Sequence, residues 1–367
     1  MRRLLSLAAL LALSACASLP GGNWLLNNTT PSQDIPITAL PGWSQNNAAP
    51  ALASFVTSCK ALMLMPPDTS LGGNGAIAAK IGQAGQWDAA CAAAKTIPPN
   101  DEAAAQTFFQ NWFTATIISR HAMISGYFEP EVQGAKNARA GFRIPLYAKP
   151  ALASLANLPR SAIDNGALYR KTPVTAYVPS RIDAFMLQIQ GSGRIHLTNG
   201  RTLTVGFDGQ NNQPYTPIGG ILIKIGALQP DNISYQSISA WLKSHPSEAD
   251  SIMEQNQNYV YLRPLGYLPA DEGAPGALGV PLTPRHSVAI DHTALPLGAP
   301  LFIATTNPLT GTSLNLLTIA QDAGAGLQGA NQADIFFGSG NNAKAIAGLM
   351  HQPGVTYVLL PRAQPAS

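Results

Sequence analysis

The sequence predicts a mainly β protein with a helical N-terminal part, and three observations support this. Between Ala48 and about Ile118, Ala, Leu, Met, Gln and Trp recur at helical spacing. From Ala122 onward, short segments rich in Val, Ile, Tyr, Phe and Thr alternate with Gly and Pro turns, as in barrels. At 367 residues the chain exceeds the usual size of one hydrophobic core. Two all-β regions behind a helical part are therefore expected.

Two pairs of prolines, Pro66-Pro67 and Pro98-Pro99, divide the helical part into about three helices. Apolar residues at helical spacing within it would face a common core. They are Ala51, Phe55 and Cys59, then Ala78, Ile81 and Ala84, and finally Phe108, Trp112 and Phe113.

The β part contains two groups of expected strands and two expected helices. A helix at residues 237–245 carries Ile238, Trp241 and Leu242 on one face. A last helix at residues 342–350 is opened by a cap at Asn341-Asn342. The strands are expected at residues 142–147, 184–189, 194–197 and 203–207, and then at 288–290, 300–305, 316–320 and 356–360.

The N-terminus has the features of a bacterial secretion signal. Two arginines precede an apolar run of about ten residues, which is too short to span a bilayer. The ending Leu13-Ser14-Ala15-Cys16 resembles a lipobox, which implies a signal peptide at residues 1–15 and a lipid on Cys16; an ordinary signal peptide ending near Ala17 is the alternative. Ala17 rather than Asp favours the outer membrane, facing the periplasm. Residues 16–44 are rich in Pro, Asn, Ser, Thr and Gly, and predict a lipid-anchored tether.

Composition excludes some classes of partner and of site. Charged residues make up 11% of the chain, the net charge is +3, and the cations are scattered, so no nucleic-acid binding is expected. Of the two remaining cysteines, Cys59 and Cys91, a disulfide is expected in an oxidising compartment, with buried free thiols as the alternative. Two isolated cysteines without nearby histidines do not predict a zinc site.

Three carboxylates gather in the C-terminal part of this acid-poor chain. Asp322 precedes a glycine-containing stretch, Asp334 precedes Ile335, Phe336 and Phe337, and Asp291 ends an apolar segment. Glycoside cleavage needs a carboxyl group that holds a proton near neutral pH, and burial or a neighbouring carboxylate raises the pKa accordingly. The apolar neighbours favour Asp334 as this acid. An Asx turn at Asp322 and a capped turn at Asp291 are the structural alternatives.

Several local motifs occur in a fixed order from residue 125 to residue 361, and together they resemble the membrane-bound lytic murein transglycosylase A family. They are Ser-Gly-Tyr-Phe-Glu-Pro at 125–130, Phe-Arg-Ile-Pro-Leu-Tyr at 142–147, Leu-Gln-Ile-Gln-Gly-Ser-Gly-Arg at 187–194, Tyr-Thr-Pro-Ile-Gly at 215–219, Asn-Gln-Asn-Tyr-Val at 256–260, Gly-Val-Pro-Leu-Thr-Pro-Arg-His-Ser at 279–287, and the two Asp motifs at 320–326 and 333–338.

The resemblance implies both an architecture and an activity. A double-psi β-barrel would be formed by residues 45–130 and 262–367, the latter containing a 3D domain, and residues 131–261 would form an inserted second β-barrel. Glycan would lie in the groove between them. The implied enzyme is a lytic transglycosylase, which cleaves the bond between N-acetylmuramic acid and N-acetylglucosamine in peptidoglycan and leaves a 1,6-anhydromuramoyl end. The 6-hydroxyl of the sugar acts as the nucleophile, so one carboxyl group suffices as acid and then base.

The resemblance also assigns the role of the aspartates, and the residues themselves suggest the other roles. Asp334 would be the acid and base, with Asp322 and Asp291 setting its protonation or orientation. Glu129 is a rival acid that precedes a proline and lacks an evident carboxylate partner. Gln188 and Gln190, expected on one face of a strand, would bind sugar hydroxyl or acetamido groups. The backbone of the Gly191-Ser192-Gly193 loop and the rings of Tyr127, Tyr215 and Phe337 would contact sugar, with a structural turn and core packing as the alternatives.

Two departures from the family pattern concern loops. Ala323 and Ala325 lie where the family has more glycine, so Ala325 could constrain the backbone. Gln332 replaces a residue that is commonly basic.

The expected partners are peptidoglycan strands, the outer membrane through Cys16, and a cell-wall synthesis complex; no metal or organic cofactor is implied. A hydrolytic muramidase, using Asp322 or Asp291 to activate water, and a non-catalytic glycan-binding lipoprotein are the competing hypotheses. The six histidines do not lie in a nucleophile-elbow context, which disfavours a Ser-His-Asp hydrolase.

Overall fold

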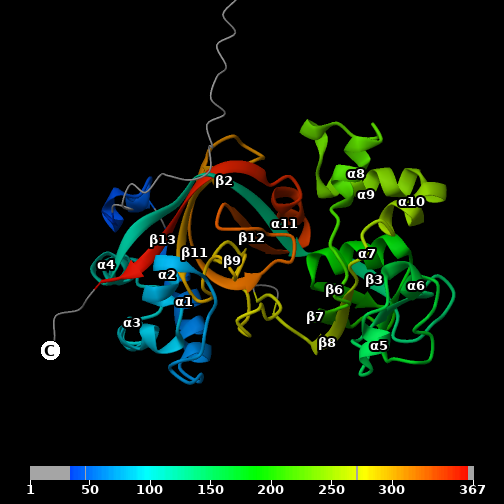
Figure 1. Cartoon of the computed structure of the whole chain (residues 1–367), viewed down its shortest axis with the longest axis horizontal. Helices are drawn as coiled ribbons and strands as arrows, with labels where there is room; N and C mark the ends of the chain where they lie inside the picture. The colour runs from blue at the N-terminus through cyan, green and yellow to red at the C-terminus, as the bar shows by residue number, and fades with distance from the viewer. Residues whose placement is uncertain (1–33, 46, 270–271, 363–367) are drawn as a thin grey trace, which may run out of the picture. The chain divides into compact units, whose positions relative to one another are not determined.

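The computed structural model describes residues 34–45, 47–269 and 272–362 (Figure 1). The predicted signal peptide and the lipid attachment at Cys16 lie outside these residues. No helix in the described part of the chain is long and apolar enough to cross a membrane.

Six strands close into a barrel, because β13 pairs back with β2. Around the barrel the order is β2, β12, β9, β11, β10 and β13, and the short strand β1 (Ile35–Pro36) pairs with the start of β2. The β2–β12 and β9–β11 pairs are parallel and the other pairs are antiparallel. The bounds are β2 Phe113–Glu129, β9 Ser287–Ile290, β10 Pro300–Thr306, β11 Ser313–Ala323, β12 Gln332–Ser339 and β13 His351–Pro361.

The N-terminal helices share the hydrophobic core of the barrel, in which aromatic rings of α1 and α4 pack together with buried strand residues. Glu102, at the start of α4, accepts hydrogen bonds from the backbone nitrogens of Ala48 and Ala49 at the start of α1 (2.7 and 2.9 Å). A disulfide joins Cys59 of α1 to Cys91 of α3, with Cα atoms 5.4 Å apart. The helices are α1 Ala48–Leu62, α2 Gly75–Ile81, α3 Asp88–Ala94 and α4 Glu102–Trp112.

Two boundaries differ from the sequence-based expectation. Phe113 and the residues up to Ile118, expected to be helical, begin the long strand β2, because their β-branched Thr and Ile side chains favour a strand. The tether was expected to reach residue 44, but Ile37, Leu40 and Trp43 are buried in the barrel core, so folded structure begins earlier in the chain.

The insert between β2 and β9 is mixed α/β rather than mainly β, which corrects the predicted fold class. A four-stranded sheet has the order β3 (Glu131–Gly134), β6 (Gly193–Leu197), β7 (Thr202–Gln210) and β8 (Val260–Gly266), and β4 (Ile144–Tyr147) pairs with β5 (Val174–Val178). The helices are α5 Ala153–Ala156, α6 Arg160–Asp164, α7 Arg181–Gln190, α8 Ile218–Lys224, α9 Tyr235–Ser244 and α10 Pro246–Met253 (Figure 1).

The strand expected at residues 184–189 is wrong, since these residues belong to helix α7. The Ser180 side chain accepts a hydrogen bond from the Asp183 nitrogen at the N-terminus of the helix, and Gly191 ends the helix with a positive φ of 76°. Helix α7 is apolar on two sides, because Phe185 packs into one cluster and Leu187 into another. Burial on both sides hides the helical period in the sequence.

The last helix, α11 (Gly340–Ala347), also begins differently from the prediction. Ser339 lies at its N-cap position, two residues before the predicted cap at Asn341-Asn342. The positive φ of Gly340, 83°, provides the sharp change of direction from β12 into the helix.

Candidate active site

The strand registers place two aspartates on one face of four neighbouring strands. Asp334 of β12 lies beside Ser125 of β2 on one side and beside Ala289 of β9 on the other. Ala289 in turn lies beside Asp322 of β11. Residues in register on adjacent strands point to the same face, so the two carboxylates flank the small Ala289 side chain, with Cα atoms about 10 Å apart.

A β-bulge at Gln321 directs Asp322 toward this face. Ala320 pairs with Val288 and Asp322 pairs with Ala289, so the register of β11 against β9 skips Gln321. Without the bulge, the period of two along a strand would place Asp322 on the opposite face from its present one.

The Gln321 side chain is fully buried, and hydrogen bonds hold it in the bulge. Its Nε2 donates to the carbonyl oxygen of Ser54 (2.9 Å) and to the hydroxyl of Ser58 (2.8 Å), both on α1. Its Oε1 accepts from the hydroxyls of Ser54 and Ser287. Helix α1 therefore supports the strand geometry that positions Asp322.

Asp334 is half-buried as a residue, and its setting favours the protonated form. Burial raises the pKa of the Asp334 carboxyl to about 7, a hydrogen bond from the Ser125 side chain acts in the opposite direction, and the charge of Asp322 raises it further. The Oδ1 atom of Asp334 is buried and has no hydrogen-bond partner among the described residues. A carboxyl group in this setting can hold a proton near neutral pH.

Asp322 is equally buried, but its oxygens are engaged. Oδ2 accepts from the Tyr127 hydroxyl (2.8 Å), and Oδ1 accepts from the backbone nitrogens of Ala277 and Ala323 (2.9 Å each). Burial raises the pKa of Asp322, and these three hydrogen bonds oppose the increase. The net pKa of Asp322 is still raised, and the three donors hold its oxygens in place beside Asp334.

Apolar residues surround the two carboxylates on the same face. Tyr127 and Phe336 lie two residues beyond Ser125 and Asp334 on their strands, and their ring centroids are 5.2 Å apart. Together with Leu282 they pack around Ala289. The other face of β12, which includes the predicted sugar-contacting Phe337, packs into the barrel core.

Tyr215 of the insert reaches the same place. Its pKa is raised, first by burial and then by the charge of Asp334. A Cβ atom on Gly326 would lie 3.1 Å from the Tyr215 ring, so the glycine allows this ring to approach the loop after Asp322. Tyr215 is also 37% exposed, which leaves part of the ring accessible to a ligand.

Known proteins match both parts of this architecture. Residues 123–263 match the MltA specific insert domain, and residues 286–360 match the 3D domain. The lytic transglycosylase LtgG of Burkholderia pseudomallei is 34% identical in sequence, with 90% of this chain and 95% of that chain covered and a TM-score of 0.59. The chain belongs to the MltA family.

Two further relatives agree with this membership. A membrane-bound lytic murein transglycosylase from Agrobacterium tumefaciens has a TM-score of 0.79 at 26% identity, with 90% of this chain and 97% of that chain covered. The Vibrio cholerae protein named membrane-bound lytic murein transglycosylase A is 30% identical over 239 residues. That alignment covers 62% of this chain, and the chain spans 62% of the relative's length.

Within the 3D domain, the structure gives Asp291 a different setting from the other two aspartates. Its Oδ1 accepts from the backbone nitrogen (2.9 Å) and hydroxyl (2.7 Å) of Thr293, and its Oδ2 accepts from the backbone nitrogen of Gly329 (2.7 Å). Desolvation raises the pKa of Asp291, but these hydrogen bonds outweigh it and the net pKa is lowered. The geometry favours the turn-capping alternative over a catalytic role.

Glu129 lies at the junction of barrel and MltA insert, where it is 1% exposed. It forms an ion pair with Arg194 of β6 (3.0 Å) and accepts a hydrogen bond from the backbone nitrogen of Ala274 (2.7 Å). Arg194 also donates to the carbonyl oxygens of Leu268, Pro269 and Glu272, at 3.1, 2.7 and 3.0 Å. This geometry favours a structural role for Glu129 over that of a rival acid.

The predicted sugar-binding glutamines of the MltA insert are engaged within the protein. Gln188 is buried and accepts from Arg160 (2.7 Å), and Gln190 accepts from the backbone nitrogen of Phe128 (3.0 Å). A Cβ atom on Gly193 would lie 2.8 Å from the carbonyl oxygen of Pro130. A hydrogen bond from Ser192 lowers the pKa of Glu129, although burial has the larger effect and raises it. The loop therefore packs against the start of the insert, as in the structural alternative.

The two departures from the family pattern cause no visible strain. Ala323 and Ala325 are absent from the described non-glycine residues with positive φ, so an alanine is tolerated at each position. Gln332 accepts a hydrogen bond from the backbone nitrogen of Gln328 (2.8 Å) and closes the loop before β12.

Three residues with clear roles in the geometry were not singled out from the sequence: Ser125, Gln321 and Arg194. Each stands inside a motif that carries the family resemblance, but the strand register that gives each its partner is not visible in the sequence. In the described part of the chain, no group of three or more His, Cys, Asp or Glu residues could hold a metal ion.

Proposed function

We propose that this protein is a lytic transglycosylase that cleaves the β-1,4 bond between N-acetylmuramic acid and N-acetylglucosamine in peptidoglycan. Asp334 would protonate the leaving oxygen and then, as a carboxylate, take the proton from the attacking 6-hydroxyl of the muramic sugar. The observation that carries the proposal is the placement of Asp334: its Oδ1 is buried without a hydrogen-bond partner among the described residues, and strand register sets it one strand away from Asp322. Burial raises the pKa of Asp334 to about 7, so that both protonation states are accessible near neutral pH. The names of the relatives, which refer to murein, support the same substrate.

The hydrogen bonds of Asp322 favour this route over hydrolysis. A hydrolase needs a second carboxylate that is free to act as nucleophile or to activate water. Three donors, from Tyr127, Ala277 and Ala323, occupy the oxygens of Asp322. Its proposed role is therefore electrostatic: its negative charge keeps Asp334 protonated before cleavage. The proposed glycan path runs past Asp334 and Tyr215, between barrel and insert.

Analysis of the products tests the reaction. After digestion of purified peptidoglycan, we expect fragments with 1,6-anhydromuramoyl ends, which are lighter by one water than hydrolytic fragments. Mass spectrometry distinguishes the two. Reducing ends throughout would establish a muramidase instead, and binding without any cleavage would establish a glycan-binding lipoprotein.

We further propose that Cys16 carries a lipid that holds the protein on the periplasmic face of the outer membrane, although Cys16 lies outside the described residues. The relatives' description as membrane-bound supports an anchor. Changing Cys16→Ser is expected to move the protein from the membrane pellet to the soluble periplasmic fraction. An unchanged membrane fraction would refute the lipid anchor.

We also propose that the barrel has double-psi topology, that the domains comprise residues 45–130 with 262–367 and residues 131–261, and that the insert closes into a second barrel. The closed six-stranded barrel and the separate four-stranded sheet support a two-part architecture of this kind.

A further inference from the structure

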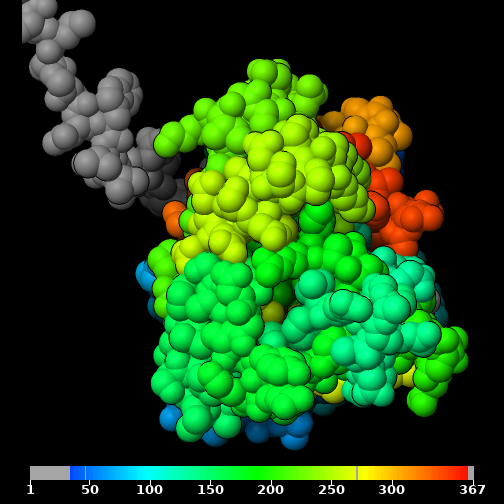
Figure 2. Space-filling view, turned by 90° about the vertical axis from the view of Figure 1, so that its right-hand side faces the viewer, coloured from blue at the N-terminus to red at the C-terminus, as the bar shows by residue number. Residues whose placement is uncertain are grey.

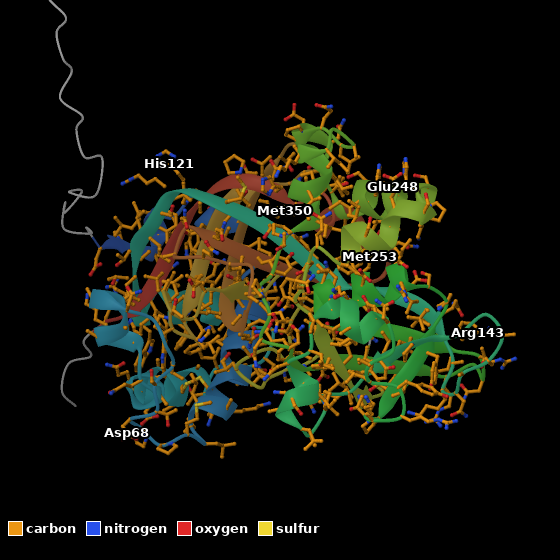
Figure 3. The ribbon with its side chains drawn as sticks, turned by 45° about the vertical axis from the view of Figure 1, so that its right-hand side comes forward. Asp68, His121, Arg143, Glu248, Met253 and Met350 are labelled. Atoms are coloured by element: carbon orange, nitrogen blue, oxygen red, sulfur yellow. A yellow bond between two sulfur atoms is a disulfide. The ribbon has the colours of Figure 1, made fainter. Side chains whose placement is uncertain are left out.

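The MltA insert contains a cavity of about 740 Å³ whose lining residues all lie between Ala138 and Tyr259. None of the residues around Asp334 contributes to it. Figure 2 faces the insert and shows a hollow near its centre. Two lining residues, Arg143 and Met253, are labelled in Figure 3, on a loop and on helix α10 respectively. A volume of this size is in the range of small-ligand sites.

The charges of the cavity are strongly unbalanced. Its lining contains Arg139, Arg143, Arg160, Arg170 and Arg181, and one acidic residue, Asp164. In a chain with only 22 basic residues, five arginines around one cavity require an explanation.

Three of the arginines already have partners within the protein. Arg139 donates to the hydroxyl of Thr198 (3.3 Å). Arg160 is 2% exposed and donates to the carbonyl oxygens of Asn256 and Asn258 and to Gln188. Arg181 pairs with Asp250 (2.9 Å) outside the cavity lining.

Arg143 and Arg170 are the available cations. Neither forms an ion pair or hydrogen bond within the described ranges, and Arg170 lies over its neighbouring Tyr169 ring at 5.2 Å. Arg170 also has a positive φ of 58°, which is uncommon for a residue with a side chain. Free guanidinium groups next to tyrosine rings are suited to a carboxylate, which they bind through paired hydrogen bonds.

Asp164 provides the opposite charge in the cavity lining, where its side chain is 20% exposed. Its nearest cation is Arg160 at 3.9 Å, and its carboxylate accepts no hydrogen bond from any described residue. Burial raises the pKa of Asp164 to about 6, and the charges of Arg160 and Arg181 oppose the increase. A ligand ammonium group would supply the missing donor and stabilise the ionised carboxylate.

We propose that this cavity binds a short peptide carrying both a carboxylate and an ammonium group, with Arg143 and Arg170 on the carboxylate and Asp164 on the ammonium. The apolar residues of the lining, such as Ile144 and Met253, would cover the peptide between the two charges. The inference rests on the proposed function, because the peptides that cross-link peptidoglycan strands have this chemistry. The cavity would thus hold the peptide of a glycan strand while the groove at Asp334 holds sugar.

Isothermal titration of the full-length protein with the tetrapeptide released from peptidoglycan by an amidase tests this inference. Wild type is expected to bind it, and the double variant Arg143→Ala/Arg170→Ala at least tenfold more weakly. Asp164→Asn should lose the preference for the peptide with a free diamino-acid side-chain amine over the form acetylated at that amine; the N-terminal amine is acetylated in both forms, because in the strand it forms the amide to the muramic sugar. Arg201→Ala is the matched control, since Arg201 is an exposed arginine of the same insert outside the cavity, and it should bind like wild type. No binding by wild type, or equal binding by the double variant, would overturn the proposal.

Separate readouts keep this test independent of the catalytic proposal. Asp334→Asn should bind the peptide like wild type, and Arg143→Ala/Arg170→Ala should cleave glycan strands stripped of peptide at the wild-type rate. If anhydro products form but the peptide does not bind, the transglycosylase proposal stands and the peptide site is refuted. If an acidic peptide without an ammonium group binds with equal affinity, the cavity is a general anion site and the proposed ligand is wrong.

Discussion

Replacing Asp334 with Asn is expected to reduce peptidoglycan cleavage by at least about a thousandfold while the protein stays folded, since general acid–base catalysis typically contributes a hundred- to ten-thousandfold. Asn has nearly the same shape as Asp, but it can neither deliver nor accept the proton. The measurement is the rate of anhydro-product release. Asp291→Asn is the matched control, because its carboxylate braces a turn, and it should retain activity within about tenfold of wild type. Equal loss in both variants would refute the distinction between the two aspartates.

The same substitution is expected to alter stability in a pH-dependent way. The Asp334 carboxyl has a pKa of about 7 in the folded protein and an ordinary value of 3.8 when exposed. The folded state therefore binds the proton more tightly, so the contribution of this group to stability is complete below pH 3.8 and is lost as the pH rises through 7. The loss is on the order of 4 kcal/mol.

Urea unfolding at pH 4, 6 and 8 measures this effect. Wild type should lose stability relative to Asp334→Asn over this range, and the wild-type cleavage rate should fall as the pH rises through about 7. A constant difference in unfolding free energy between the two proteins would show that the carboxyl is already ionised at pH 4.

The second large effect is expected at the ion pair between Glu129 and Arg194. Changing Arg194→Ala leaves a buried carboxylate without its cation, which typically costs about 3–5 kcal/mol of unfolding free energy. This is a large share of the roughly 5–15 kcal/mol that stabilises most domains. Urea unfolding measures the loss. Adding Glu129→Gln to this variant should restore part of the stability, because a neutral side chain costs less to bury.

Arg263→Ala is the matched control for this prediction. Arg263 lies on strand β8 of the same sheet, is exposed and donates one hydrogen bond to the carbonyl oxygen of Phe207 (3.3 Å), so its loss should change the unfolding free energy by only about 0.5 kcal/mol. The effect of Arg194→Ala should also shrink as the pH falls, because Glu129 then takes up a proton and needs no cation. An effect independent of pH would indicate lost packing rather than a lost charge pair.

The barrel could be predicted from the sequence to a useful extent, and the insert less well. Strands β9, β10 and β11 were expected to within three residues at each end, because each contains an apolar run between turn residues. Strand β13 begins five residues before its expected start at 356, and β12 was not expected. Helix α7 could not be predicted, because burial on both sides removed the polar face that marks a helix. The start of β2 was not predicted, because the strand follows α4 without a glycine or proline between them.

The residue types of the site could be predicted from the sequence, but the strand and hydrogen-bond partners of those residues could not. The apolar sequence after Asp334 predicted a buried carboxyl, and the Oδ1 atom of Asp334 is buried, although Ile335 and Phe337 pack on the opposite face of the strand. The sequence could not distinguish Asp322 from Asp291, because both precede turn-forming residues; only the bulge at Gln321 and the register with Ala289 separate them. Gln188 and Gln190 looked available for sugar because their hydrogen-bond partners, Arg160 and Phe128, are distant in sequence.

Because the barrel must close before the Asp334 carboxyl is buried, the proposed acid forms late in folding. Tyr127 and Asp322, which are hydrogen-bonded in the site, are 195 residues apart in sequence, and the whole insert separates them. Contacts between such distant segments form slowly, because the intervening chain must first be brought to order. Until β2 joins β12, Asp334 is exposed to water and ionised at neutral pH like any surface aspartate. A chain that is only partly folded therefore lacks the proposed proton donor, which forms only when the barrel has closed.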